Sequence, residues 1–188
     1  LSSHFLITYL IPKLRRGMQV VFTKEELTSD DKLNKSAYQV WEDRTFPFHY
    51  EKRFTLLEGG IVQSGVQEIV KIANKYSDKP LNKINVLDIG SGRGEYSREM
   101  SKFFGEIIGV EPYEDVYKFC LEHTPKKYKN LSFSNTRVED FQSKRKFNLI
   151  VMLTVFEHMP NPKKSFDNIF KLLKKNGIVY LTSPNKYW

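Results

Sequence analysis

An acidic residue followed by a glycine-rich loop is the feature of this sequence with the clearest chemical meaning. Asp88 closes an apolar run, and the loop after it alternates glycines with other residues: Gly90, Ser91, Gly92, Arg93, Gly94. Glycine lets the backbone turn sharply and brings its N–H groups close to a ligand that side chains would obstruct. The dinucleotide pattern G-x-G-x-x-G would need a glycine where Glu95 stands. The loop therefore suits a cationic amino-acid group better than a pyrophosphate.

Alternating strands and helices are expected to position this loop. Apolar residues at helical spacing predict a helix over 61–76, which a linker containing Pro80 ends. Beyond it, the pattern predicts strands over 84–90, 107–112, 131–136, 147–154 and 177–184, and helices over 95–104, 116–122 and 162–175. Strands that alternate with helices at this interval pair in parallel through right-handed crossovers. The expected fold is α/β, with a doubly wound, mostly parallel sheet and the loop at the carboxyl end of its first strand.

The loop segment resembles the first motif of the class I, Rossmann-like S-adenosylmethionine-dependent methyltransferases. The stretch IIGVEP (107–112) is similar to their second motif, and RVEDF (137–141) is similar to the segment that lies beside the adenine. The run 147–185 is similar to the family's fourth strand, helix and fifth strand, including the Glu157-His158 pair. The resemblance covers residues 84–188, and it is specific because four motifs follow one another in the correct order.

The resemblance implies S-adenosylmethionine as the cofactor and assigns its contacts. Asp88 would hold the loop and the methionine ammonium group, and Glu111 would accept hydrogen bonds from both ribose hydroxyls. Arg137 and Val138 depart from the family's pattern, so the group that reads the adenine stays open. The full implied set is Asp88, Gly90, Ser91, Gly92, Gly94, Glu111, Pro112, Val138, Glu139, Leu153 and Thr154.

Each of these residues also allows a simpler interpretation. The glycines could serve a turn alone, Asp88 could cap the following helix, and Glu111 could be a solvated charge at a strand end. His158 is the candidate catalytic base, because histidine accepts protons near neutral pH. A role for His158 in shaping the pocket beside the fourth strand is nevertheless favoured.

Composition limits the classes of protein to consider. The 188 residues, 40% of them hydrophobic, suffice for one globular domain with a buried core. The single cysteine, Cys120, excludes an intramolecular disulfide, provides no Cys cluster for a metal, and makes the cytoplasm the expected compartment. It lies at an apolar helical position, which favours core packing over a nucleophile. The formal charge of +8 is spread through short lysine clusters, so RNA binding is not favoured.

The chain divides by composition into a tail (1–30), a helical lead-in or lid (31–80) and a cofactor-binding core (81–188). Its first apolar stretch, 5–11, is too short to span a bilayer and precedes its basic residues, so neither a membrane span nor a secretory signal is expected. Met18 is the expected natural start. The lead-in aromatics that could close over a cofactor are Tyr38, Trp41, Phe46, Phe48 and Tyr50.

The end of the chain departs from the family's complete sheet, which continues beyond a fifth strand into an antiparallel hairpin. The sheet is therefore expected to be truncated after its fifth strand, as a fragment or a minimal version. An exposed edge of this kind can pair with a second chain, so an oligomer is one expectation.

The expected function is methyl transfer to an unidentified acceptor, with a small molecule, lipid precursor or glycan favoured over RNA. The sulfonium already activates the methyl carbon, so the enzyme mainly aligns the acceptor and excludes water. The main alternative is a truncated or degenerate module that binds the cofactor without turnover. A protein that binds a nicotinamide cofactor is the third alternative, and Glu95 counts against it.

Overall fold

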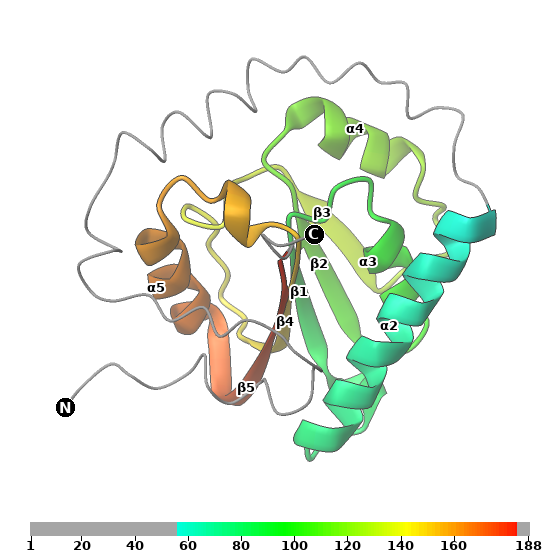
Figure 1. The fold of residues 1–188 in the computed structure, drawn as a ribbon, viewed down its shortest axis with the longest axis horizontal. Coiled ribbons are helices and arrows are strands. Elements are labelled where there is room, and N and C mark those ends of the chain that lie inside the picture. The colour runs from blue at the N-terminus through cyan, green and yellow to red at the C-terminus, as the bar shows by residue number, and fades with distance from the viewer. Residues whose placement is uncertain (1–55, 184–188) are drawn as a thin grey trace.

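A parallel sheet of five strands forms the centre of the protein. The computed structural model describes residues 56–183, and its strands lie in the order β3-β2-β1-β4-β5 (Figure 1). Every neighbouring pair runs in parallel. The strands are β1 (Asn85–Ile89), β2 (Glu106–Val110), β3 (Leu131–Ser134), β4 (Phe147–Leu153) and β5 (Leu173–Thr182). The expected α/β fold with a parallel sheet is confirmed.

Helices lie on both sides of this sheet, as Figure 1 shows. Helices α2 (Leu56–Tyr76), α3 (Glu95–Met100) and α4 (Glu114–Glu122) lie on one side, and α5 (Pro162–Leu172) lies on the other. Short 3-10 helices, η2 (Leu81–Lys83) and η3 (Phe156–His158), precede β1 and follow β4. Asn161 caps α5, since its side chain accepts the N–H of Lys164 and Pro162 begins the helix.

Two apolar clusters fill the space between the sheet and its helices. Successive strand residues point to opposite faces, so Val86 packs with the α2 and α3 side while Leu87 packs with the α5 side. Both residues are fully buried. Strands covered on both faces read as continuous apolar runs, and this explains the sequence of β4.

Several element boundaries differ from the sequence-based expectation; for example, α2 begins at Leu56 rather than at Ile61, and β5 begins at Leu173 rather than at Gly177. The helix expected over 162–175 ends at Leu172, because Leu173 is already extended with ψ 138 and pairs with Phe147. The register of β5 then shifts before Ile178 pairs with Leu149, and Asn176 adopts a positive φ of 61 within the shift. The helix expected over 95–104 ends at Met100, and turns complete the passage to β2.

The tail expected over 1–30 and the aromatic lid residues of the lead-in lie outside the described residues. Among residues 56–183, no helix combines the length and the apolar character needed to cross a bilayer. The same residues contain no group of three or more His, Cys, Asp and Glu side chains that could hold a metal ion.

Candidate cofactor-binding site

The glycine loop connects β1 to α3 and is fastened to the end of β2. The N–H groups of Gly90 and Ser91 both donate to the carbonyl of Val110, at 2.8 and 3.1 Å. The three glycines have φ values of 66, 53 and 78, a region that L residues occupy only at a cost. The loop therefore has its shape because these positions are glycine.

Space around the glycines divides them into two kinds. A methyl group added at Gly90 would lie 2.4 Å from Cγ2 of Val155, and one added at Gly94 would lie 2.6 Å from Sγ of Cys120. A methyl group added at Gly92 would meet no atom within 4 Å. Gly90 and Gly94 thus permit close packing, whereas Gly92 borders open space in which a ligand can approach the backbone.

Asp88 is buried beneath this loop, at 2% exposure. Its Oδ2 accepts a hydrogen bond of 2.5 Å from the hydroxyl of Ser97, a residue of α3. Burial raises the pKa of Asp88 to about 7, the Ser97 hydrogen bond opposes this increase, and the Glu111 carboxylate adds to it. Asp88 therefore accepts a hydrogen bond from a side-chain hydroxyl of α3. The N-cap residue of that helix is Gly94, and no side-chain hydrogen bond caps the helix there.

Glu111 follows β2 and joins the loop to the next segment. Its Oε2 accepts the N–H of Gly92 and its Oε1 accepts the N–H of Tyr113, both at 3.0 Å. Burial raises the pKa of Glu111, while the hydrogen bonds from Tyr113 and Gly92 lower it. Each carboxylate oxygen has a further lone pair, so the group can also accept hydrogen bonds from a ligand. The solvated strand-end charge is not observed, because Glu111 is 5% exposed.

The segment expected beside the adenine lies partly in the core. Val138 is buried, and its carbonyl accepts a hydrogen bond of 2.6 Å from the Asn168 side chain. Oε1 of Glu139 accepts the hydroxyl of Ser165, at 2.5 Å, so this side chain is already engaged with α5. Pro112 is held by Asn135, whose Nδ2 donates to the carbonyl oxygens of Glu111 and Pro112.

The residues expected on the methionine side lie where β4 ends. Leu153 is half-buried, and Thr154 is exposed. Thr154 has a positive φ of 53, which is unfavourable for a β-branched residue, and its N–H donates to the carbonyl of Thr182 on β5. His158 lies in η3, where Nε2 is 3.9 Å from Oε1 of Glu157. The hydroxyl of Ser183 donates to the other Glu157 oxygen, at 3.3 Å.

The structure therefore brings Asp88, the glycines and Glu111 together at the carboxyl ends of β1 and β2. Ser91 belongs to this group by its backbone, while its side chain packs over Gly109 of β2. Open space at Gly92 and an acidic side chain at the end of β2 fit a ligand that carries hydroxyl and cationic groups. The residues present thus fit S-adenosylmethionine.

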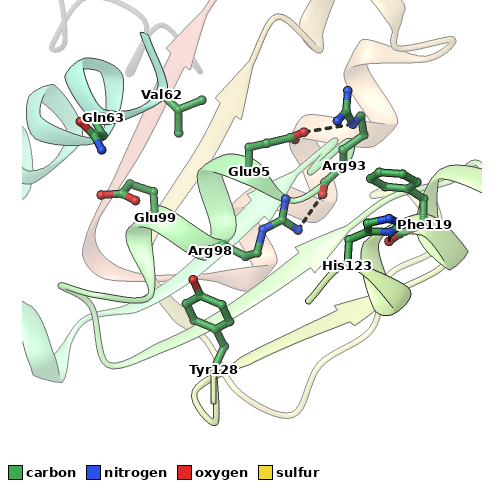
Figure 2. Close-up of a pocket in the computed structure, with 9 residues that line it drawn as sticks. All are labelled: Val62, Gln63, Arg93, Glu95, Arg98, Glu99, Phe119, His123 and Tyr128. Carbon is green, nitrogen blue, oxygen red and sulfur yellow. Dashed lines mark hydrogen bonds and ion pairs between the residues drawn. The ribbon is translucent and has the colours of Figure 1, made fainter. Parts of the chain in front are cut away.

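A cavity of about 280 Å³ lies beside this loop, between α2, α3 and α4. Figure 2 shows its lining: Val62, Gln63, Arg93, Glu95, Arg98, Glu99, Phe119, His123 and Tyr128. Both of its arginines are engaged by neighbouring groups, since Nε of Arg93 lies 3.0 Å from Oε1 of Glu95 and Nη1 of Arg98 donates to the Arg93 carbonyl. Arg93 is its one residue from the loop, and neither Asp88 nor Glu111 lines it. The loop is therefore the candidate cofactor site rather than this cavity, whose acidic lining residues are Glu95 and Glu99.

Sequence reasoning missed the residues that hold the site residues in place. Ser97 binds Asp88, and Tyr113 binds Glu111 through its N–H. A sequence signal for Ser97 existed in its position on the predicted helix that follows the glycine loop, and the structure adds that this polar residue is fully buried. Contacts between elements that lie far apart in the sequence, such as that between Gly94 and Cys120, leave no local pattern in the sequence.

A family model described as "Methyltransferase domain" matches residues 62–188, which is more than half of the chain. Among curated relatives, the ubiquinone biosynthesis O-methyltransferase of Pelagibacter ubique is 27% identical over 158 residues, covering 83% of this chain and 64% of that protein. The protein of the same name from Glaesserella parasuis is 29% identical over 107 residues, covering 54% of this chain and 45% of that protein. The chain thus spans less than two thirds of the length of either relative.

Solved structures show the same fold. YcgJ from Bacillus subtilis aligns with a TM-score of 0.55 at 21% identity, covering 62% of this chain and 48% of that chain. The plantazolicin methyltransferase BpumL, solved in complex with SAH, aligns with a TM-score of 0.58 at 18% identity, covering 80% of this chain and 57% of that chain. The glycine loop, the strand order and the family match agree, and the chain belongs to the methyltransferase-domain family of class I, Rossmann-like, S-adenosylmethionine-dependent methyltransferases.

Proposed function

We propose that this chain binds S-adenosylmethionine at the glycine loop and transfers its methyl group to a small-molecule acceptor. The observation that supports this most directly is the pairing of Glu111 with the loop amide of Gly92, next to open space. A glycine loop and an acidic residue at the ends of adjacent parallel strands form the usual ligand crevice of such sheets. Membership of the methyltransferase-domain family supports the same function.

The proposed roles of the residues follow from their positions. Glu111 accepts hydrogen bonds from the ribose hydroxyls, and the loop backbone around Gly92 lies against the methionine portion. Asp88 acts beneath the loop, through its hydrogen bond with Ser97. When bound, the cofactor supplies a methyl group already activated by the sulfonium. The remaining proposed contacts come from the segments that follow β2, β3 and β4: Pro112, Val138, Glu139, Leu153 and Thr154.

An oxygen atom of a small aromatic precursor is the first acceptor to test. The curated relatives are named as O-methyltransferases of ubiquinone biosynthesis, which points to a hydroxyl group on a quinone precursor. A quinone precursor falls within the acceptor classes expected from the sequence, which include small molecules and lipid precursors. The cytoplasmic location and an oligomer formed through the sheet edge stay predictions, as does the division into tail, lead-in and core.

His158 is the candidate base for a hydroxyl acceptor, because such an acceptor must lose its proton on methylation. Its side chain is 37% exposed and lies next to Glu157, beyond the end of β4. A base role predicts a turnover loss of about 10²-fold or more in His158→Gln with unchanged cofactor affinity. A loss below about tenfold would instead assign His158 to shaping the pocket, which is the favoured interpretation.

Calorimetric titration of S-adenosylmethionine and S-adenosylhomocysteine tests the cofactor assignment. We expect both to bind the wild-type chain, and binding to weaken by about tenfold or more in Glu111→Ala, ~1.4 kcal/mol. Glu106→Ala is the matched control, because Glu106 begins the same strand at its other end and pairs with Arg145 on the surface. Absence of binding to a folded wild-type chain would contradict the proposal.

A second experiment separates the enzyme from a module that binds the cofactor without turnover. Formation of S-adenosylhomocysteine is measured with hydroxylated aromatic acceptors, lipid precursors and glycans, with bulk tRNA as the nucleic-acid acceptor. Turnover on any of them supports methyl transfer. Tight binding without product from the full set favours the binding module. A steep salt dependence of tRNA affinity would favour an RNA acceptor.

A further inference from the structure

The glycine loop rests on an aromatic ring from a strand two places away in the sheet. A methyl group added at Gly94 would lie 2.8 Å from Cζ of Phe133, and one added at Gly109 would lie 2.5 Å from Cδ1 of the same ring. Gly109 belongs to β2 and Phe133 to β3, and the two pair in register. The ring of Phe133 therefore fills the space between the loop and the sheet that side chains at both glycines would occupy.

Two side chains, one from α4 and one from α3, bind the loop's carbonyl groups. The thiol of Cys120, on α4, donates to the carbonyl of Gly92 at 3.4 Å. Nη1 of Arg98, on α3, donates to the carbonyl of Arg93 at 2.8 Å and to Oγ1 of Thr124 at 3.2 Å. Figure 2 shows the bond between Arg98 and Arg93. The loop is thus joined to α4 and to the turn after it.

The direction of these bonds matters for a ligand. A trans peptide points its carbonyl and the following N–H to opposite sides. The Cys120 thiol holds the Gly92 carbonyl toward α4, so the amide that follows it, that of Arg93, points away from α4. The amide that follows the Arg93 carbonyl, that of Gly94, donates to the Ser91 carbonyl. On the other side of the loop, Val155 packs against Gly90, where an added methyl group would lie 2.4 Å from its Cγ2. The loop is held between these two sets of contacts.

We propose that Arg98, Cys120 and Phe133 are positioning residues that set the shape of the glycine loop and, through it, the affinity for the cofactor. The effect on affinity rests on the proposed function, whereas the effect on loop shape does not. Cys120 acts as a hydrogen-bond donor here, since burial raises the pKa of its thiol to about 12 and keeps it protonated. This assigns Cys120 a role beyond the plain core packing expected from the sequence.

Ordinary core packing is the competing explanation, and a matched control separates the two. Phe104 is a buried phenylalanine that precedes β2, at the end of the strand remote from the loop. Phe133→Leu and Phe104→Leu remove the same volume, so both should lower the unfolding temperature. Arg98→Met removes the guanidinium while keeping most of the stem. Cys120→Ala removes the thiol donor, and Cys120→Ser restores a donor at the same place.

The experiment combines hydrogen exchange with calorimetry on the full chain. The N–H groups of Gly92 and Gly94 report loop shape, because they donate to Glu111 and to the Ser91 carbonyl. We expect their exchange to accelerate by about tenfold in Phe133→Leu, Arg98→Met and Cys120→Ala, and to stay at the wild-type rate in Phe104→Leu. The dissociation constant of S-adenosylhomocysteine should rise by about tenfold in the same three variants, with partial recovery in Cys120→Ser.

The two readouts keep this proposal separate from the cofactor assignment. Equal exchange at Gly92 and Gly94 in the wild type and all three variants would overturn the positioning role. An affinity loss in Phe104→Leu as large as that in Phe133→Leu would also overturn it, because the effect would then follow stability alone. If the wild-type chain does not bind S-adenosylhomocysteine, the proposed function fails, and hydrogen exchange still decides whether these residues position the loop.

Discussion

Oε2 of Glu111 accepts the N–H of Gly92 at 3.0 Å, and this bond joins the end of β2 to the loop that follows β1. The same carboxylate accepts the N–H of Tyr113, so one side chain fixes both the loop and the start of the next segment. A carboxylate that binds two backbone amides is held in place before a ligand arrives, and less conformational entropy is then lost on binding. Under the proposed function, the position of Glu111 couples loop shape to cofactor affinity.

Gly90 and Gly92 should respond differently to substitution by alanine. Both have positive φ, which costs an L residue about 1–2 kcal/mol. Gly90→Ala also places its methyl group 2.4 Å from Val155, so we expect the larger loss of unfolding free energy there. Gly92→Ala meets no atom within 4 Å, so its stability loss should be limited to backbone strain while cofactor affinity falls sharply.

Chemical denaturation and calorimetry of the two variants check this contrast. Gly60→Ala is the control, because this helical glycine has no atom within 4 Å of an added methyl group and no positive φ. Alanine in a helix should leave stability equal or slightly higher. Unchanged cofactor affinity in a folded Gly92→Ala variant would contradict a ligand at this position.

The sequence allowed the strands, their parallel pairing and the acidic residues at the carboxyl ends of β1 and β2 to be predicted, because these depend on local patterns. Apolar runs and the spacing of turns identify strands, and parallel pairing follows from the intervening helices. The end of α5 could not be predicted. Leu173 continues the apolar helical pattern of its segment, and it is pairing with Phe147 on a neighbouring strand that makes it extended. Tertiary contacts decided that boundary.

In the candidate site too, some residues could be predicted from their neighbours in the sequence, whereas others depend on contacts between distant segments. Asp88 and Glu111 were identifiable because Asp88 closes an apolar run within β1 and Glu111 follows the apolar run of β2. Their partners were not, since the Ser97 hydroxyl reaches Asp88 only through the way α3 packs on the sheet. The role of Phe133 likewise depends on two glycines from different elements lying against one ring. Such contacts require the folded structure.

Removal of the Ser97 hydroxyl should destabilise the protein. Ser97→Ala would leave the buried Asp88 carboxyl without its donor, and an unsatisfied buried polar group costs about 1–3 kcal/mol. Ser101→Ala is the matched control, because its hydroxyl donates to the Arg98 carbonyl in a half-buried position and its loss should cost less. Urea unfolding at neutral pH measures both. Equal losses of unfolding free energy in the two variants would show that the hydrogen bond to Asp88 stabilises the protein no more than the bond that Ser101 makes.

The Asp88 carboxyl should make stability depend on pH. Its pKa is raised from 3.8 to about 7, so between these values the folded state holds a proton that the unfolded state releases. The stability that this proton provides is complete below the unfolded pKa and is lost as the pH rises through the folded pKa. A tenfold difference in proton affinity between the folded and unfolded states is worth about 1.36 kcal/mol, so the loss amounts to a few kcal/mol at most.

Urea unfolding of the wild type and Asp88→Asn between pH 5 and pH 8 tests this dependence. We expect the wild-type free energy of unfolding to fall across this range and the decrease to be clearly smaller in Asp88→Asn. Part of the decrease should persist in the variant, because burial raises the pKa of Glu111 in the same direction. Identical slopes in the two proteins would mean that Asp88 is already ionised when buried.

Thr154 is held in an unfavourable backbone conformation at the end of β4, and relief of that strain should stabilise the protein. Its φ of 53 is costly for a β-branched residue, and the side chain is exposed. Thr154→Gly should therefore raise the free energy of unfolding by about 1 kcal/mol. Asn176→Gly is the matched control, with a φ of 61, because asparagine tolerates this conformation and should gain less. Thermal unfolding of both variants measures the difference, and a destabilised Thr154→Gly would show that the threonine side chain, which donates to the Leu153 carbonyl, is worth more than the strain it carries.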